Sequence, residues 1–183
     1  MRSASKQQVD QSYVHSLGEA IRFERDSLGY TQEGFAERIG FDRGYMGRVE
    51  RGESNLTFGK LIIVLRALGA KPRDFFREIH LRGQPRDVST DPSIKKENAQ
   101  RENVSDMLGA ALKLERHRFE LTQEELAARV GKSRSYIISL ECGHGNPTFT
   151  VLMQILEGLA IEPAEFFRHF PLPKRKRPPK PPA

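Results

Sequence analysis

The 183-residue sequence contains a single cysteine, Cys142, and no long run of apolar residues. One cysteine excludes a framework of internal disulfides and fits a protein of the reducing cytosol. No apolar stretch is long enough to span a bilayer, and no apolar segment follows Arg2 as it would in a secretory signal. We therefore expect a soluble, cytoplasmic protein that makes no membrane contact.

Motifs that carry catalysis are missing as well. The sequence has no glycine-rich phosphate loop, no nucleophile elbow and no set of His, Asp and Glu at the spacing of metal ligands. Cys142 and His144 lie close together, but without further ligands they fall short of a zinc site. The sequence thus predicts neither an enzyme nor a protein with a metal or cofactor.

Positive charge is concentrated at the end of the chain. The net charge is +6, and residues 169–183 carry five Lys or Arg and no acidic residue. The remainder of the chain is therefore close to neutral, and the high isoelectric point belongs mostly to the tail. Global charge alone is weak support for nucleic-acid binding.

The chain is a tandem repeat. Residues 17–77 align without a gap with residues 108–168, and 25 of the 61 aligned pairs are identical. This length is too great for a solenoid element and suits a small domain. No segment alternates with the period of a strand, whereas apolar residues recur at helical spacing. The sequence predicts an all-α protein built from two similar units.

Each unit is expected to contain five helices. Leu17, Ile21 and Leu28 share one face of the first helix, and glycines follow the second helix in both units. Candidate N-terminal caps precede the second, third and fourth helices: Thr31, Asp42, Thr57, Thr122, Ser133 and Thr148. Proline opens the fifth helix of each unit, which ends in a pair of phenylalanines expected in the core or in a dimer interface: Phe75, Phe76, Phe166 and Phe167.

These patterns divide the chain into five segments. They are a flexible N-terminus (1–12), a first helical domain (13–79), a polar linker (80–103), a second helical domain (104–170) and a disordered, basic, proline-rich tail (171–183).

Two short helices joined by a glycine-containing turn, residues 31–39 and 42–51, match the helix-turn-helix pattern. Thr-Gln-Glu opens the second helix of both units, Ala-x-Arg-x-Gly closes it, and Glu-x-Gly ends the third helix. In this combination both units resemble the Cro and lambda-repressor (Xre) family. The resemblance implies two tandem five-helix, lambda-repressor-like DNA-binding domains.

The resemblance also assigns roles to residues. In that family the third helix enters the major groove, which implies base contacts for Arg43, Gly44, Arg48, Arg134, Ser135 and Ser139. Arginine at such a position can bond both O6 and N7 of guanine. Phosphate contacts are implied for Gln32, Gln123 and Arg51. A partly buried ion pair between the first and third helices is implied twice, for Arg25 with Glu50 and for Arg116 with Glu141.

The sequence therefore predicts a sequence-specific regulator of transcription that binds double-stranded DNA, acts as a bacterial repressor and associates with the nucleoid. Either one chain spans two unlike half-sites, or two chains pair as a homodimer on a palindrome. The alternative is a protein-interaction module, an antitoxin or antiactivator. The second unit keeps it open, because this unit is near-neutral and slightly acidic and Ile138 is expected to be exposed on its groove side.

Overall fold

The computed structural model describes residues 2–81, 104–168 and 170, and these residues are helical with no extended strand. Most of the expected linker and all of the expected basic tail (171–183) lie outside the described residues. No helix within the described ranges is long and apolar enough to cross a membrane.

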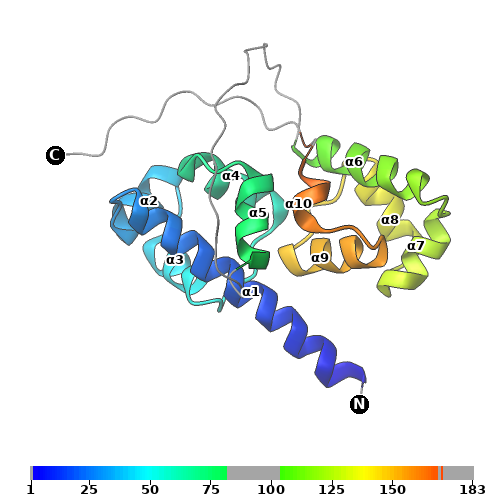
Figure 1. Ribbon diagram of the computed structural model, residues 1–183, viewed down its shortest axis with the longest axis horizontal. Helices are drawn as coiled ribbons and strands as arrows, with labels where there is room; N and C mark the ends of the chain where they lie inside the picture. Colours follow the sequence, from blue (N-terminus) through cyan, green and yellow to red (C-terminus); the bar gives the residue numbers. More distant parts are fainter. Residues whose placement is uncertain (1, 82–103, 169, 171–183) are drawn as a thin grey trace, which may run out of the picture.

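Each unit contributes five helices, as the sequence predicts (Figure 1). The first unit comprises α1 (Arg2–Ser27), α2 (Gln32–Ile39), α3 (Arg43–Glu50), α4 (Phe58–Leu68) and α5 (Pro72–Leu81). The second comprises α6 (Val104–Arg118), α7 (Gln123–Val130), α8 (Arg134–Glu141), α9 (Phe149–Gly158) and α10 (Pro163–Phe166).

The short helices begin where the sequence places their caps. The side chains of Thr31 and Asp42 accept hydrogen bonds from backbone N–H groups three residues later, and Ser133 does the same at α8. At α7, Thr122 and Glu125 bond each other's backbone N–H in a capping box. The caps thus fix the first turn of helices that are only eight residues long.

Thr57 and Thr148 depart from this pattern. Both are the N-cap residues of their helices, as the sequence predicts, but neither side chain makes a capping hydrogen bond. The two residues instead face each other across the junction of the units and form an isolated antiparallel β-bridge. Their local sequence resembles a cap, while their function in the fold is long-range pairing.

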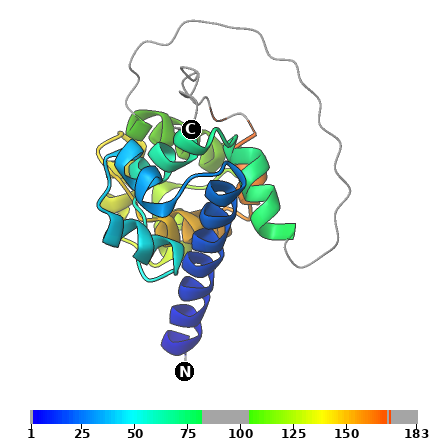
Figure 2. The same ribbon diagram turned by 90° about the vertical axis from the view of Figure 1, so that its left-hand side faces the viewer.

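The first helix differs from the expectation at both ends. It begins at Arg2, so residues 2–12, predicted to be flexible, form its first turns and project beyond the rest of the unit (Figures 1 and 2). No glycine or proline interrupts residues 1–17, so nothing in this segment stops a helix. At the other end, Leu28 lies past the helix and is 40% exposed, so it is not a core residue.

The two units pack against each other through a reciprocal set of contacts. The N–H of Phe58 donates to the carbonyl of Pro147 at 2.8 Å, and the N–H of Phe149 donates to the carbonyl of Leu56 at 2.7 Å. Phe58 corresponds to Phe149 in the repeat, and Leu56 corresponds to Pro147. The two bonds are therefore copies of each other with the units exchanged, which is the signature of a two-fold relation.

At this junction α5 meets α10 (Figure 1). A stack of phenylalanine rings fills it. The rings of Phe76 and Phe167 lie near-parallel with their centroids 4.7 Å apart. Phe58 stacks on Phe167, and Phe149 stacks on Phe76, again as a reciprocal pair. All four are buried, and such ring pairs stabilise by about 0.5–1.5 kcal/mol beyond their burial.

We predict that Phe76→Ala destabilises the protein by about 3–5 kcal/mol, because it removes a ring that is 3% exposed and contacts both units. Urea denaturation followed by circular dichroism measures the change. Leu114→Ala serves as the control, since Leu114 is 68% exposed and its truncation should alter stability by no more than about 0.5 kcal/mol. A Phe76→Ala variant as stable as this control would show that the stack does not make the proposed contribution to stability.

Candidate nucleic-acid interface

The third helix of each unit presents one face to solvent. Arg43, Gly44 and Arg48 on α3 are exposed, as are Arg134 and Ser135 on α8. Ser139, the counterpart of Arg48, is half-buried and thus less exposed than these residues. The positions to which the sequence assigns base contacts therefore lie together on the outer face of each helix.

The opposite face of each third helix is held against the first helix of its unit. Met46 and Val49 are buried on α3, and Ile137 and Leu140 are buried on α8. The approach requires a glycine on the first helix: a Cβ built at Gly18 would lie 2.4 Å from the carbonyl oxygen of Val49. Gly109 stands in the same relation to Leu140 in the second unit, also at 2.4 Å, so a larger residue at either position would push the third helix outward.

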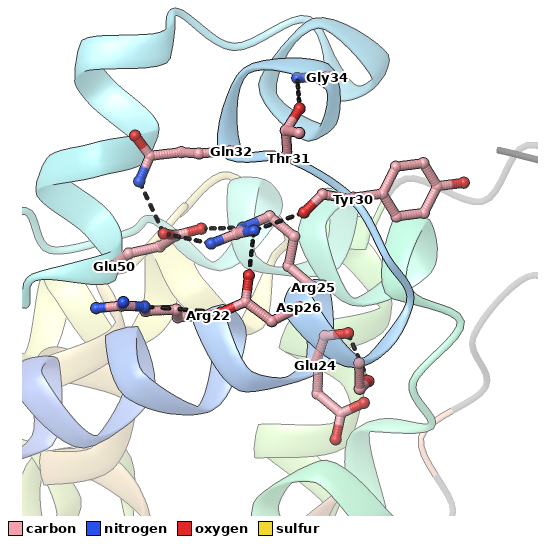
Figure 3. A network of polar contacts seen from close by, with 10 residues as sticks. Arg22, Glu24, Arg25, Asp26, Tyr30, Thr31, Gln32, Gly34 and Glu50 are labelled. Carbon is pink, nitrogen blue, oxygen red and sulfur yellow. Dashed lines mark hydrogen bonds and ion pairs between the residues drawn. The ribbon is translucent and has the colours of Figure 1, made fainter. Parts of the chain in front are cut away.

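A buried ion pair fixes the end of α3 (Figure 3). Arg25 donates from Nε and Nη2 to the two carboxylate oxygens of Glu50, at 2.6 and 3.0 Å. The arginine side chain is 6% exposed and the glutamate 3%. Arg25 Nη1 also donates to the carbonyl of Tyr30 and to Asp26, so each nitrogen of the guanidinium has a partner. The hydrogen bonds from the guanidinium to Glu50 raise the pKa of Arg25.

The second unit repeats this arrangement. Arg116 donates to both oxygens of Glu141 at 2.6 and 2.9 Å, and Nη1 donates to the carbonyl of Leu121. Burial raises the pKa of Glu141, but the hydrogen bonds from Arg116 and Gln123 and the positive charge of Arg116 lower it by more, so the pKa lies below its ordinary value of 4.5. The ion pairs that the resemblance implies are thus present in both units.

The two glutamines take a role that the sequence reasoning missed. Gln32 donates from Nε2 to Glu50 at 2.8 Å (Figure 3), and Gln123 donates to Glu141 at 2.9 Å. Each glutamine therefore ties the first residue of the second helix to the ion pair. An amide nitrogen has two N–H groups, and this bond uses one of them. A signal existed in the sequence, since Gln, Arg and Glu recur together at the same offset in both copies.

Basic side chains flank the outer face of α3. Arg43 lies 3.4 Å from Glu33 in an exposed ion pair, and Arg51 makes a two-point contact with Glu53. The Glu53 hydrogen bonds raise the pKa of Arg51. Lys60 lies over the ring of Tyr45, 4.2 Å from its centroid, and was not among the predicted residues. Exposed pairs of this kind break at little cost, so these cations remain usable by an incoming anion.

The second unit is poorer in charge on the same surface. Where the first unit has Arg51, Glu53 and Lys60, the repeat places Cys142, His144 and Val151. Cys142 and His144 are exposed. Within the described ranges, no three His, Cys, Asp or Glu side chains come together as a metal site would require. The two outer faces are therefore similar in shape and unlike in chemistry.

The helix-turn-helix family profile matches the chain twice, at residues 21–76 and 112–166, which is more than half of its length. The chain belongs to the helix-turn-helix family, with two domains of the Cro and lambda-repressor type. Each match begins in the first helix of a unit and ends in its fifth, at Phe76 and at Phe166.

Individual relatives match one helix-turn-helix domain. An HTH-type transcriptional regulator of Sinorhizobium fredii, y4dJ, described as uncharacterized, is 44% identical over 45 residues, 25% of this chain and 58% of that protein. The control protein C.SmaI of Serratia marcescens is 44% identical over 52 residues, 28% of this chain and 62% of that protein. The chain thus spans less than two thirds of the length of these two relatives.

Among solved structures, the restriction-modification controller protein C.AhdI of Aeromonas hydrophila is 32% identical in sequence. The match covers 34% of this chain and 94% of that protein, with a TM-score of 0.33.

Glu50→Ala should destabilise the protein by about 3–5 kcal/mol, because it leaves the Arg25 guanidinium buried without its carboxylate. Thermal and urea unfolding measure the loss. Glu53→Ala is the matched control: it removes the same side chain from an exposed pair and should leave the stability nearly unchanged. Equal stability of the two variants would show that the buried pair does not hold α3.

The depressed pKa of Glu141 predicts a pH dependence. A carboxylate whose folded-state pKa is lowered stabilises the fold above its unfolded-state pKa, about 4.3 for glutamate, and loses that contribution as pH falls through the folded-state value. The stability difference between the native protein and Glu141→Gln should therefore be largest above about pH 5 and shrink below pH 4. Urea midpoints measured from pH 7 to pH 3 test this, with exposed Glu124→Gln as the control; a constant difference would contradict it.

Proposed function

We propose that the protein is a sequence-specific, double-stranded-DNA-binding regulator of transcription that reads the major groove with α3 and α8. The observation that carries the proposal is the pair of eight-residue helices, each buried on one side and exposing arginine on the other. Family membership supports it, as do two relatives described as a transcriptional regulator and a control protein.

Base recognition falls to the exposed side chains of the third helices. Arg43 and Arg48 lie less than two turns apart on α3, and each can bond one guanine through O6 and N7. On α8, Arg134 offers one such contact, and Ser135 and Ser139 offer hydroxyl groups. Gly44 leaves the start of α3 free of side-chain bulk. Each good arginine–guanine contact contributes about 1–3 kcal/mol of discrimination.

Phosphate contacts fall to the groups around the reading helices. The remaining N–H of Gln32 and of Gln123 lies at the N-terminus of α2 and of α7, where free backbone N–H groups favour an anion. Arg51 and Lys60 add cations beside the first unit. Such contacts position the protein without reading sequence, and they make its affinity depend on salt.

As a repressor, the protein would act by covering DNA that polymerase needs. This role goes beyond DNA binding and can be tested directly, because occlusion requires only that the protein and the polymerase compete for one site. A transcription assay with purified polymerase, on a template carrying the bound site, should show less transcript as protein is added. Increased transcript would make the protein an activator.

We predict that Arg43→Ala/Arg48→Ala weakens specific DNA binding at least tenfold, since two base contacts of about 1–3 kcal/mol each are lost and 1.4 kcal/mol corresponds to tenfold. Salt-titrated gel shifts on DNA selected from random duplexes by the full chain provide the measurement. Arg73→Ala/Arg77→Ala removes the same charge from exposed positions on α5 and should leave the affinity within about threefold.

Unchanged binding in the Arg43/Arg48 variant, or an absence of any specific DNA, would favour a protein-interaction module. Ile138 keeps that alternative specific, because it is half-buried on α8 where α3 has a buried glycine. In that case, a partner protein would be sought with Ile138→Ala as the variant expected to lose it.

A further inference from the structure

We infer that a single chain occupies its DNA site, with the two units as an internal pair on two inverted half-sites of different sequence. The inference rests on the proposed function, and it concerns stoichiometry and the symmetry of the site. It follows from how the two units contact each other and from where they differ.

The contacts between the two units give the direction in which the units pair. The bonds from Phe58 to Pro147 and from Phe149 to Leu56 exchange when the units exchange, and Thr57 faces its own counterpart, Thr148. A head-to-tail repeat would instead bring unlike surfaces together and leave one of each at the ends. The reading helices α3 and α8 are therefore related by a rotation of half a turn. A duplex has two-fold axes of the same kind, and a two-fold pair of helices suits inverted half-sites.

The surface through which the two units pair is already covered within the chain. Phe76 and Phe167 are 3% and 2% exposed, and each ring is stacked on a ring of the other unit. A second chain would need this same surface in order to pair through it. The chain thus meets DNA with its self-complementary surface covered from within, so we expect a monomer both free and bound.

The junction between the units favours one copy of each unit over two identical copies. Asn55 donates to the hydroxyl of Thr150, whose counterpart in the first unit is Gly59, and the N–H of Gly59 donates to Asn146 at 3.0 Å. Tyr13 donates to Glu157, at a place where the exchanged pair would be Val104 and Arg66. The Tyr13–Glu157 bond needs one copy of each unit, because two first units would pair Tyr13 with Arg66 and two second units would pair Val104 with Glu157.

The two reading helices carry different side chains at the positions proposed to contact bases. Positions 43, 44 and 48 are Arg, Gly and Arg, while their counterparts at 134, 135 and 139 are Arg, Ser and Ser. One arginine is shared and one is not. The half-sites should therefore agree at one guanine and differ elsewhere, about one turn of the duplex (~34 Å) apart. A true palindrome of either half-site would satisfy only one of the two helices.

The test uses the full chain and a site obtained by its selection from random duplexes. Four duplexes are compared: the selected site, a palindrome of each half-site, and a direct repeat of the two halves. Native mass spectrometry gives the number of chains per duplex, and gel shifts give the affinities. We expect one chain per duplex and at least tenfold weaker binding to either palindrome and to the direct repeat. Two chains per duplex, or a palindrome bound as tightly as the selected site, would overturn the inference while leaving the proposed function intact.

A change in the DNA avoids any variant that fails to fold. Five base pairs inserted between the half-sites turn them to opposite sides of the duplex, and ten restore the phase. With the units locked by the phenylalanine junction, the five-base-pair insertion should reduce affinity to that of one half-site. Full affinity after this insertion would mean that only residues 82–103 connect the units on DNA, which overturns the inference. If no duplex is selected at all, the proposed function fails and the inference fails with it.

Discussion

The orientation of the third helix in each unit depends on the buried contact between an arginine of the first helix and the glutamate that ends the third. An eight-residue helix is not stable alone, so its direction is set by what it touches. Gly18 lets α3 approach α1 closely, and the two-point bond from Arg25 to Glu50 fixes rotation about that contact. Burying two charges is costly, yet here each guanidinium nitrogen has an acceptor and Gln32 donates to the carboxylate. The pair therefore gives orientation, which a purely apolar contact between two smooth helices would leave less defined.

The junction between the units imposes a second constraint, on the position of the two units relative to each other. Two units joined in one chain meet at a high effective concentration, so their pairing does not depend on how much protein is present. The stack of Phe76 on Phe167 then converts this proximity into a fixed geometry. Without the stack, α3 and α8 would be tethered and independent. With it, the distance and angle between them are a property of the folded chain, so under the proposed function a duplex is in register either with both helices or with only one.

The sequence was sufficient for the parts of the structure that depend on local chemistry or on the repeat. Helix starts at Thr31, Asp42 and Ser133 follow from hydrogen bonds within one turn, and the ion pairs follow from a resemblance supported by their recurrence. Long-range contacts were not predictable in this way. Thr57 and Thr148 look like caps because a cap and a bridge use the same residue types, and only the folded chain shows that they meet. The exposure of Leu28 has the same origin: its spacing fits a helical face, but the helix ends at Ser27. For the glutamines, the resemblance implied a phosphate contact, and their bond to the glutamate of the ion pair was missed.

The differences between the two copies are not spread evenly over the fold. Groups that orient the third helix are the same in both: the glycine under it, the arginine and glutamate of the ion pair, and the glutamine that joins them. Groups on and around its outer face differ, with Ser139, Cys142 and Val151 in place of Arg48, Arg51 and Lys60. In a homodimer, every substitution on that face would appear on both third helices at once. In a single chain with an internal two-fold, one face can change while the other stays, and the shared supports still hold both at the same angle. The pattern is therefore the one that the proposed function requires, with two third helices in matched orientation on half-sites of unlike sequence.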